Sequence, residues 1–220
     1  DIKKAVNSSD VIFICVGTPT KKGSLKVDLS YVYKSIKEII SSTKNKKIIV
    51  TKSTVPVGTG DEIEKIIKKL KKKNFDVISN PEFLREGDAI RDFRYPDRIV
   101  IGSNNKKMFK KMKILYTPLI SKGAKFFTTS RRGAELIKYA SNAFLATKIT
   151  FINELANLSE KTGVDIKDIS LGMGSDQRIG DRFLRAGPAY GGSCFPKDTR
   201  ALINIGAKFN TDLSIVKSVV

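Results

Sequence analysis

The run VIFICVG at 11–17 is a continuous stretch of apolar residues, rich in β-branched side chains, that ends in a glycine. Three further runs of this kind follow along the chain: IIVTKS at 48–53, FDVIS at 75–79 and RIVIG at 98–102. Strands that a parallel sheet buries on both faces have this composition. The segments between the runs are amphipathic and long enough for crossover helices: 29–43, 60–73 and 106–115. The sequence therefore predicts an α/β fold, a doubly wound Rossmann-like domain built on a parallel sheet.

The usual opening of a dinucleotide-binding fold is missing from this pattern. Such a fold begins with a strand, a GxGxxG turn and a helix, followed about twenty residues later by an acidic residue that binds ribose. The nearest pattern here, Gly58-Thr59-Gly60, has no third glycine, and we interpret it as the start of a helix. We therefore expect an incomplete Rossmann-like domain in which the chain begins in the middle of the sheet.

After residue 130 the sequence changes character. Residues 134–162 contain neither glycine nor proline and are followed by Gly163, a pattern that predicts one long central helix. Apolar residues spaced by three and four give this helix a face that should pack against a partner or another helix: Leu136, Ala140, Ala143, Ala146, Ile149 and Ile152. This region predicts an all-helical domain.

Shorter helices should follow the long one. We expect one at 165–171, one that begins near Asp198-Thr199 and runs to residue 208, and one that opens near residue 212. Asp198 would cap the second of these. We therefore divide the chain into an incomplete Rossmann-like domain at 1–129 and a central helical domain at 130–220.

Composition limits the classes of function. The chain has 220 residues and a formal charge of +19, but its lysines lie largely on predicted helix faces, and we find no zinc-finger or RNP-type pattern. We expect no nucleic-acid partner. No apolar stretch approaches the roughly 18 residues of a membrane span, and no signal-peptide segment opens the sequence, so we expect a cytoplasmic protein without a membrane partner. Histidine is absent, which leaves acid–base chemistry to Lys, Asp, Glu, Cys or water.

The two cysteines lie in different settings. Cys15 falls inside the first apolar run, and we interpret it as part of the strand core. Cys194 lies in YGGSCFPKD at 190–198, where Lys197 would favour the thiolate and the glycines would let a substrate approach closely. Taken alone, this loop could also be a turn that carries a half-buried thiol. The other motifs must decide between these readings.

Five segments occur in one order along the chain: FICVGTPT (13–20), KSTVPVGTG (52–60), NPEFLREGDAI with PDRIVIG (80–90 and 96–102), AELIKYASNAFLATKITFINE (134–154), and RIG with YGGSCFPKD (178–180 and 190–198). Together they closely resemble the UDP-glucose/GDP-mannose dehydrogenase family. The resemblance implies an NAD-dependent enzyme that oxidises the C6 alcohol of a nucleotide sugar twice, to the carboxylate. It implies that two NAD are consumed and that a cysteine holds the aldehyde between the steps.

The resemblance also assigns catalytic and cofactor residues. Cys194 matches the family's nucleophile, which captures the aldehyde as a thiohemiacetal. Lys138 and Asn142 lie four apart on the predicted long helix, and they match a lysine and an asparagine that stabilise oxyanions. The remaining catalytic matches are Glu82 and the water-positioning residues Asp198 and Thr54. The cofactor contacts implied by the resemblance are Thr18, Thr54, Glu86 and Lys197.

The substrate contacts that the resemblance implies come from several segments. They are Glu82, Phe83, Leu84, Arg85, Glu86, Lys138, Asn142, Arg178, Phe183, Leu184, Arg185, Ala186, Gly187 and Gly191. Arg178 matches an arginine that reaches the sugar in the neighbouring subunit's site, and the family pairs as a homodimer through the central helix. Arg185-Ala186 and Ala189 depart from the small residue, proline or glycine of the family pattern. The conformation of this loop, and with it the sugar preference, is therefore less well defined.

Other interpretations stay open. Without the motif, Lys138 would simply extend its chain from an apolar helix to solvent, and Glu82 and Glu86 would be ordinary solvated acids. NPEFLREG and GGSCFPKD favour UDP-glucose, with GDP-mannose as the alternative substrate. The family's opening glycine loop and its C-terminal nucleotide-binding domain are not found in the sequence, so we expect the 220 residues alone to be inactive. A noncatalytic dimerisation remnant is the rival interpretation.

Overall fold

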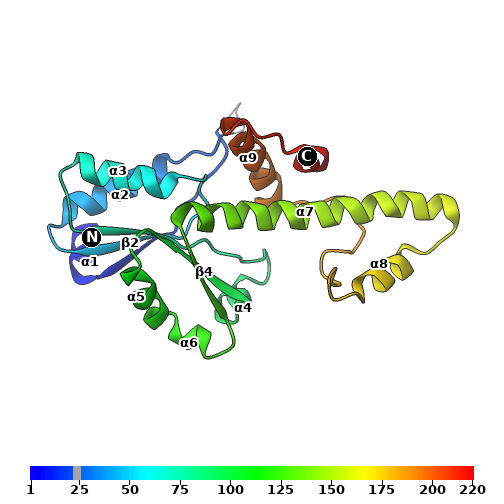
Figure 1. Ribbon diagram of the computed structural model, residues 1–220, viewed down its shortest axis with the longest axis horizontal. Coiled ribbons are helices and arrows are strands. Elements are labelled where there is room, and N and C mark those ends of the chain that lie inside the picture. The colour runs from blue at the N-terminus through cyan, green and yellow to red at the C-terminus, as the bar shows by residue number, and fades with distance from the viewer. Residues whose placement is uncertain (22–25) are drawn as a thin grey trace. The chain divides into compact units, whose positions relative to one another are not determined.

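The computed structural model describes residues 1–21 and 26–220. The chain divides into two compact units, Asp1–Lys138 and Tyr139–Val220, which are described separately. The first unit holds a five-stranded sheet and the second contains helices (Figure 1). The boundary between the units falls within the helix α7 (Arg131–Thr162).

The sheet of the first unit has the strand order β1-β2-β3-β4-β5. Its strands are β1 (Val11–Ile14), β2 (Lys47–Thr51), β3 (Phe75–Ser79), β4 (Arg98–Ser103) and β5 (Lys125–Thr129). Neighbouring strands run parallel except β3 and β4, which are antiparallel. The four predicted strands are confirmed. The expectation of an all-parallel sheet is wrong at the β3–β4 pair, and β5 was not predicted.

Helices cover both faces of this sheet. Those of the first unit are α1 (Ile2–Ser8), α2 (Ser30–Ser42), α3 (Thr59–Lys69), α4 (Ala89–Arg94), α5 (Lys107–Leu115) and α6 (Thr117–Ile120). Strand β2 is buried throughout, and its side chains alternate between two cores. Ile49 packs with α2 and α3, whereas Ile48 and Val50 pack with α5 on the opposite face (Figure 1). The doubly wound α/β prediction is therefore confirmed.

The Gly58–Gly60 segment begins a helix, as predicted. Gly58 lies at the N-cap of α3 with a φ of 96°, a left-handed conformation that favours glycine. Acidic residues occupy the first turn of α3 and lysines its last turn, which complements the helix dipole. The chain thus turns sharply from the carboxyl end of β2 into α3.

The prediction for Cys15 is wrong. Strand β1 ends at Ile14, and Cys15 is exposed just beyond it. Because β1 is an edge strand of the described sheet, it has one strand neighbour rather than two. The apolar run therefore continues past the point at which the structure buries it.

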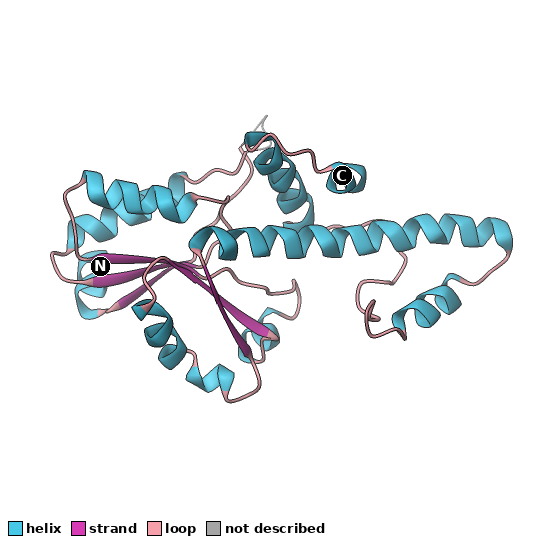
Figure 2. Ribbon diagram, viewed as in Figure 1, coloured by secondary structure: helices cyan, strands magenta, loops and turns pink. Residues whose placement is uncertain are grey.

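The second unit contains helices joined by loops (Figure 2). Besides the C-terminal part of α7, its helices are α8 (Ile166–Gly174), α9 (Cys194–Lys208) and α10 (Ser214–Val219). The long central helix is confirmed, although it begins at Arg131 and includes Gly133. Helix α9 begins at Cys194 rather than near Asp198. Asp198 lies inside α9 and is buried, so its interpretation as a cap is wrong.

The predicted apolar face of α7 is only partly correct. Ala143, Ala146 and Ile152 are buried, but Leu136 is 44% exposed and Ala140 is also exposed. The buried side of the helix includes polar residues instead: Glu135, Lys138 and Asn142. Hydrophobic spacing misplaces the face because these polar side chains are paired within the protein.

Across the described segments, no helix is both long enough and apolar enough to cross a lipid bilayer.

Candidate active site

The first group of predicted site residues lies at the carboxyl end of β3. Lys138 is 3% exposed, and its Nζ lies 3.0 Å from Glu82 Oε1. The interpretation of Lys138 as a solvent-reaching lysine is therefore wrong. A lysine ammonium has three donors, so two remain after the bond to Glu82. The pair places a fixed cation directly beside a carboxylate.

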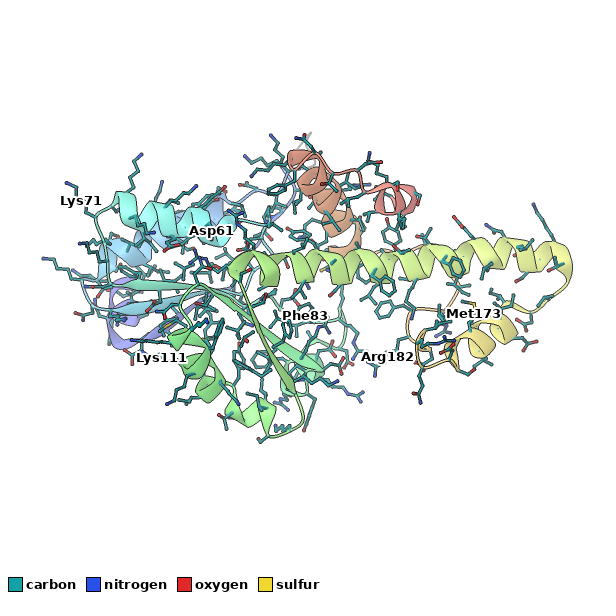
Figure 3. All side chains as sticks on the ribbon, viewed as in Figure 1. Asp61, Lys71, Phe83, Lys111, Met173 and Arg182 are labelled. Carbon is teal, nitrogen blue, oxygen red and sulfur yellow. The ribbon has the colours of Figure 1, made fainter. Side chains whose placement is uncertain are left out.

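The segment that follows Glu82 is held by polar and aromatic contacts. The backbone N–H of Leu84 donates to Glu82 Oε2 at 2.5 Å. Phe83, labelled in Figure 3, lies under two cations, with Arg98 4.0 Å and Lys138 Nζ 5.4 Å from its ring centroid. These contacts fix the orientation of the Glu82 carboxylate and bring Phe83 to Lys138.

Two other predicted contacts of this segment point elsewhere. The guanidinium of Arg85 pairs with Asp88 at 3.0 Å and with Asp92 at 2.5 Å. Glu86 is exposed. The structure therefore brings Glu82, Phe83 and Lys138 together, whereas the side chains of Arg85 and Glu86 lie toward the surface.

The carboxyl ends of β1 and β2 are tied together by hydroxyl groups. Thr18 Oγ1 donates to the Thr54 carbonyl at 2.9 Å, and Ser53 Oγ donates to the Val16 carbonyl at 2.6 Å. The position of a Cβ on Gly17 would meet nothing within 4 Å. The predicted pair Thr18 and Thr54 is thus brought together beside open space at this edge of the sheet.

Two ionisable residues near these groups were not singled out from the sequence. Lys52 directly follows β2, and its Nζ lies 3.5 Å from Asn80 Oδ1. Burial lowers the pKa of Lys52 to about 8, and the nearby charge of Glu82 opposes that decrease. The sequence signal that could have identified Lys52 is its position directly after the fully buried strand β2.

Glu135 is the second such residue. Its carboxylate accepts from Gly58 N at 2.7 Å, from Gly60 N at 2.9 Å and from Ser79 Oγ at 2.9 Å. Burial raises the pKa of Glu135, and these three hydrogen bonds oppose the rise. A small cavity in the same unit is lined in part by Thr54, Glu135 and Lys138.

The other group of predicted residues belongs to the second unit and centres on Asp198. This carboxylate is 1% exposed. Asn142 Nδ2 donates to its Oδ2 at 2.6 Å, and Lys197 Nζ donates to its Oδ1 at 2.6 Å. Cys194 is exposed on the first turn of the same helix α9, and its Sγ lies 3.8 Å from Ser193 Oγ. Burial thus fixes the carboxylate while the thiol remains accessible.

The predicted substrate loop of the second unit is mostly exposed. Arg178 pairs with Asp176 at 2.6 Å, yet its side chain is 89% exposed. Phe183 has a φ of 66° and packs edge-on against Phe195. The peptide N–H of Gly187 donates to Asn153 Oδ1 at 2.9 Å.

The other members of the loop differ in burial. Leu184 is 3% exposed, and its carbonyl accepts from Ser170 Oγ at 2.7 Å. Ala186 is half-buried, whereas Arg185 and Gly191 are exposed. Leu184 therefore anchors the loop to α8, and its neighbours lie on the surface.

In the part of the chain that the structure describes, no three His, Cys, Asp or Glu side chains are grouped as metal ligands would be. The two groups of site residues offer ammonium, carboxylate, amide and thiol side chains. A cation and an amide donor can stabilise an oxyanion, and an accessible thiol can add to a carbonyl carbon.

Comparison with known proteins finds one enzyme family in both parts of the chain. Residues 1–120 match the NAD binding domain of the UDP-glucose/GDP-mannose dehydrogenase family, and residues 132–220 match its central domain. The UDP-glucose 6-dehydrogenase of Rhizobium meliloti is 52% identical over 100% of this chain and 51% of its own length. That of Rickettsia prowazekii is 53% identical over 96% of this chain and 48% of its own. The chain spans about half the length of the curated relatives it matches.

A solved structure supports the fold. The UDP-glucose dehydrogenase of Pyrobaculum islandicum superimposes with a TM-score of 0.93 at 39% identity, over 100% of this chain and 51% of that one. The fold and the family resemblance predicted from the motifs are both confirmed. The match to the NAD binding domain makes NAD the cofactor that the family implies. The chain belongs to the UDP-glucose/GDP-mannose dehydrogenase family.

Proposed function

We propose that this chain supplies the NAD-binding and central catalytic regions of a UDP-glucose 6-dehydrogenase, which oxidises the C6 alcohol of UDP-glucose to the carboxylate of UDP-glucuronate. The observation that carries the proposal is the buried Asp198. It lies on α9, the helix that presents Cys194, and it binds Asn142 of α7 and Lys197 of α9. The names of the Rhizobium and Rickettsia relatives favour UDP-glucose as the sugar nucleotide. We keep 1–129 and 130–220 as the proposed bounds of the two regions.

The carboxyl edge of the sheet fits the bound cofactor. The open space beside Gly17 and the hydroxyl groups of Thr18 and Thr54 suit a ligand that approaches the backbone closely. We assign Thr18, Thr54 and Glu86 to NAD in the first unit and Lys197 in the second. When bound, NAD accepts a hydride from the sugar carbon in each of the two oxidations.

The protein side chains handle the oxygen and the carbon. Lys138 and Asn142 each keep a donor after their bonds to Glu82 and Asp198, and these donors would stabilise the alkoxide of the first oxidation. The Cys194 sulfur adds to the aldehyde carbon, which forms a C–S bond and a thiohemiacetal. Loss of a second hydride converts this species to a thioester.

Hydrolysis completes the reaction. Asp198 and Thr54 are proposed to position the water that attacks the thioester carbon. The C–S bond then breaks, the carboxylate product leaves and the thiol of Cys194 is restored. Glu82 holds Lys138 and contacts the sugar, together with the backbone of the Phe83–Glu86 segment. Arg178 and the loop from Phe183 to Gly187, with Gly191, are proposed to contact the substrate.

We also propose that the protein is a homodimer through α7. Phe144, Phe151 and Leu158 are 66%, 46% and 55% exposed, and they recur every seven residues along one side of the helix. Two such helices could bury these apolar residues against each other.

The dimer is tested by light scattering. At micromolar concentration, it should give the dimer mass for the unaltered chain. Phe144→Glu with Phe151→Glu should give the monomer, whereas Leu171→Glu on α8 should not. A monomeric unaltered chain would contradict the proposal.

The function is tested with two proteins. One is the 220-residue chain, and the other is an extended form in which the flanking segments of the Rhizobium meliloti relative are joined to both ends. NADH formation from UDP-glucose should occur with the extended form and not with the chain alone. Robust turnover by the chain alone would refute its predicted inactivity. Oxidation of GDP-mannose but not UDP-glucose would refute the substrate, and oxidation of neither would favour a noncatalytic dimerisation role.

A further inference from the structure

Glu135 is a buried carboxylate that the proposed mechanism does not use. It is 3% exposed and lies on the first turns of α7, within the first unit. One oxygen accepts from Gly60 N and Ser79 Oγ, and the other accepts from Gly58 N. A buried carboxylate with three charge-assisted hydrogen bonds is held firmly in place. Its partners therefore share one fixed anchor.

Each segment joined at this anchor carries a predicted site residue within one turn of chain. Gly58 follows Thr54 by four residues, and Ser79 precedes Glu82 by three. Glu135 itself precedes Lys138 by three on α7. A single carboxylate thus joins the β2–α3 turn, the end of β3 and the start of α7. These are the segments that present Thr54, Glu82 and Lys138.

The fit around the carboxylate is close. A Cβ on Gly60 would lie 2.9 Å from Arg131 Cδ, 3.0 Å from Glu135 Oε1 and 3.1 Å from Ser79 Oγ. A side chain at this position would therefore have to displace Arg131, Glu135 or Ser79, so glycine gives the backbone N–H the closest approach to the carboxylate. The N-terminus of α3, which attracts anions, is occupied by a side chain of the protein itself.

A second contact joins the same two helices and does not compete for Glu135. Arg131 binds Asp61 at 2.8 Å and also contacts Glu64, both on α3. Arg131 thus binds the acidic side chains of α3, and Glu135 binds its N-terminal peptide groups. The Arg131 contact therefore docks the body of α3 on α7, whereas the Glu135 contact places the turn before α3.

We propose that Glu135 is a positioning residue, whose carboxylate sets the places of Thr54 and Glu82 relative to Lys138. This role of Glu135 in catalysis rests on the function proposed above. A displacement of about 1 Å at a reacting group costs about a hundredfold in rate, so such an anchor affects turnover without touching the substrate.

The first experiment measures amide hydrogen exchange in the folded 220-residue chain. In Glu135→Gln the side-chain oxygen can serve two donors, but the new NH₂ group must face the third. Exchange at Gly58 and Gly60 should rise at least about tenfold, and it should also rise at 52–57 and 79–84. Glu154→Gln, which alters an exposed glutamate of the same helix, is the matched control and should change neither segment.

Two milder variants keep the test valid if Glu135→Gln does not fold. Ser79→Ala removes one of the three donors, and Glu135→Asp keeps the charge but shortens its reach. Both should raise exchange in the same segments by a smaller factor. Unchanged exchange in a folded variant would overturn the proposal. An equal rise throughout the first unit, including β4 and β5, would also overturn it, because it would show only a general loss of stability.

The second experiment measures turnover in the extended form. Glu135→Gln should lower kcat at least about tenfold and change KM for UDP-glucose less than about threefold, and Glu135→Asp should recover part of kcat. Local opening without any loss of kcat would overturn the positioning role. If the unaltered extended form oxidises no sugar nucleotide, the proposed function fails. The exchange result then still decides whether the carboxylate holds the three segments.

Discussion

The two groups of predicted site residues differ in how the protein holds them. In the first unit, Lys138 is buried against Glu82, and the backbone N–H of Leu84 donates to the same carboxylate. In the second unit, Asp198 is as deeply buried, but Cys194 and Arg178 are exposed. Lys138 and Asp198 are therefore held inside their units, whereas the Cys194 thiol and the Arg178 guanidinium lie at the surface. Changes to the buried groups should reduce both stability and activity, and changes to the exposed ones should reduce activity alone.

Lys138→Met should have the largest effect on stability. It removes the cation and leaves the Glu82 carboxylate, which is only 25% exposed, without its ammonium partner. We expect a loss of about 3 kcal/mol in the free energy of unfolding. In the extended form, turnover should fall at least about a hundredfold. Urea unfolding of the chain measures the first quantity. A loss below about 0.5 kcal/mol would break the comparison, because the pair would then behave as a surface ion pair.

Asp198→Asn tests the buried group of the second unit. The new amide offers one oxygen where two donors, from Asn142 and Lys197, now bind two oxygens. We expect a loss of about 2 kcal/mol in the free energy of unfolding, again by urea titration. Asp212→Asn alters an exposed acid that pairs with Lys217 and serves as the control. Equal effects of the two substitutions would contradict the account.

Lys52 gives the first unit a pH dependence of its own. Its folded pKa, lowered to about 8 mainly by burial, lies below that of the unfolded chain, so the unfolded state binds more protons above pH 8. Its contribution to the free energy of unfolding should therefore rise with pH. From about pH 7.5 to pH 9, the difference between the unaltered chain and Lys52→Met should shift by about 1 kcal/mol in favour of the unaltered chain. A difference that does not change with pH would contradict this.

Arg178→Ala should have the smallest effect on stability. The guanidinium is almost fully exposed and pairs with Asp176, two residues before it. We expect no measurable shift in the thermal midpoint of the chain. Turnover of the extended form should nevertheless fall, because the side chain is proposed to reach the sugar of the neighbouring subunit. A clear loss of stability would show that the exposed group also supports the fold.

Much of the fold could be predicted because burial leaves a pattern in the sequence. Strand β2 is buried throughout and reads as an apolar run, whereas β5 is largely exposed, reads KFFTT and gives no such run. Strand direction leaves no comparable pattern, so the antiparallel β3–β4 pair could not be predicted.

The candidate site was predictable to a different degree. The motifs identified residues such as Lys138 and Asp198, but their partners depend on segments far apart in the chain. Glu135 was missed because a glutamate on a helix usually faces solvent, and its partners Gly58, Gly60 and Ser79 lie far from it in the sequence. Hydrophobic spacing along α7 failed at Leu136 and Ala140 for the related reason that paired polar groups occupy the buried side.

The chain has two exposed thiols, Cys15 in the first unit and Cys194 in the second, and they allow a direct test of the proposed chemistry. The measurement is the rate of UDP-glucuronate formation by the extended form carrying Cys194→Ser or Cys15→Ser. The account predicts a fall of at least about a thousandfold for Cys194→Ser and a change of less than about twofold for Cys15→Ser. Acid formation at the unaltered rate by the Cys194→Ser protein would contradict it.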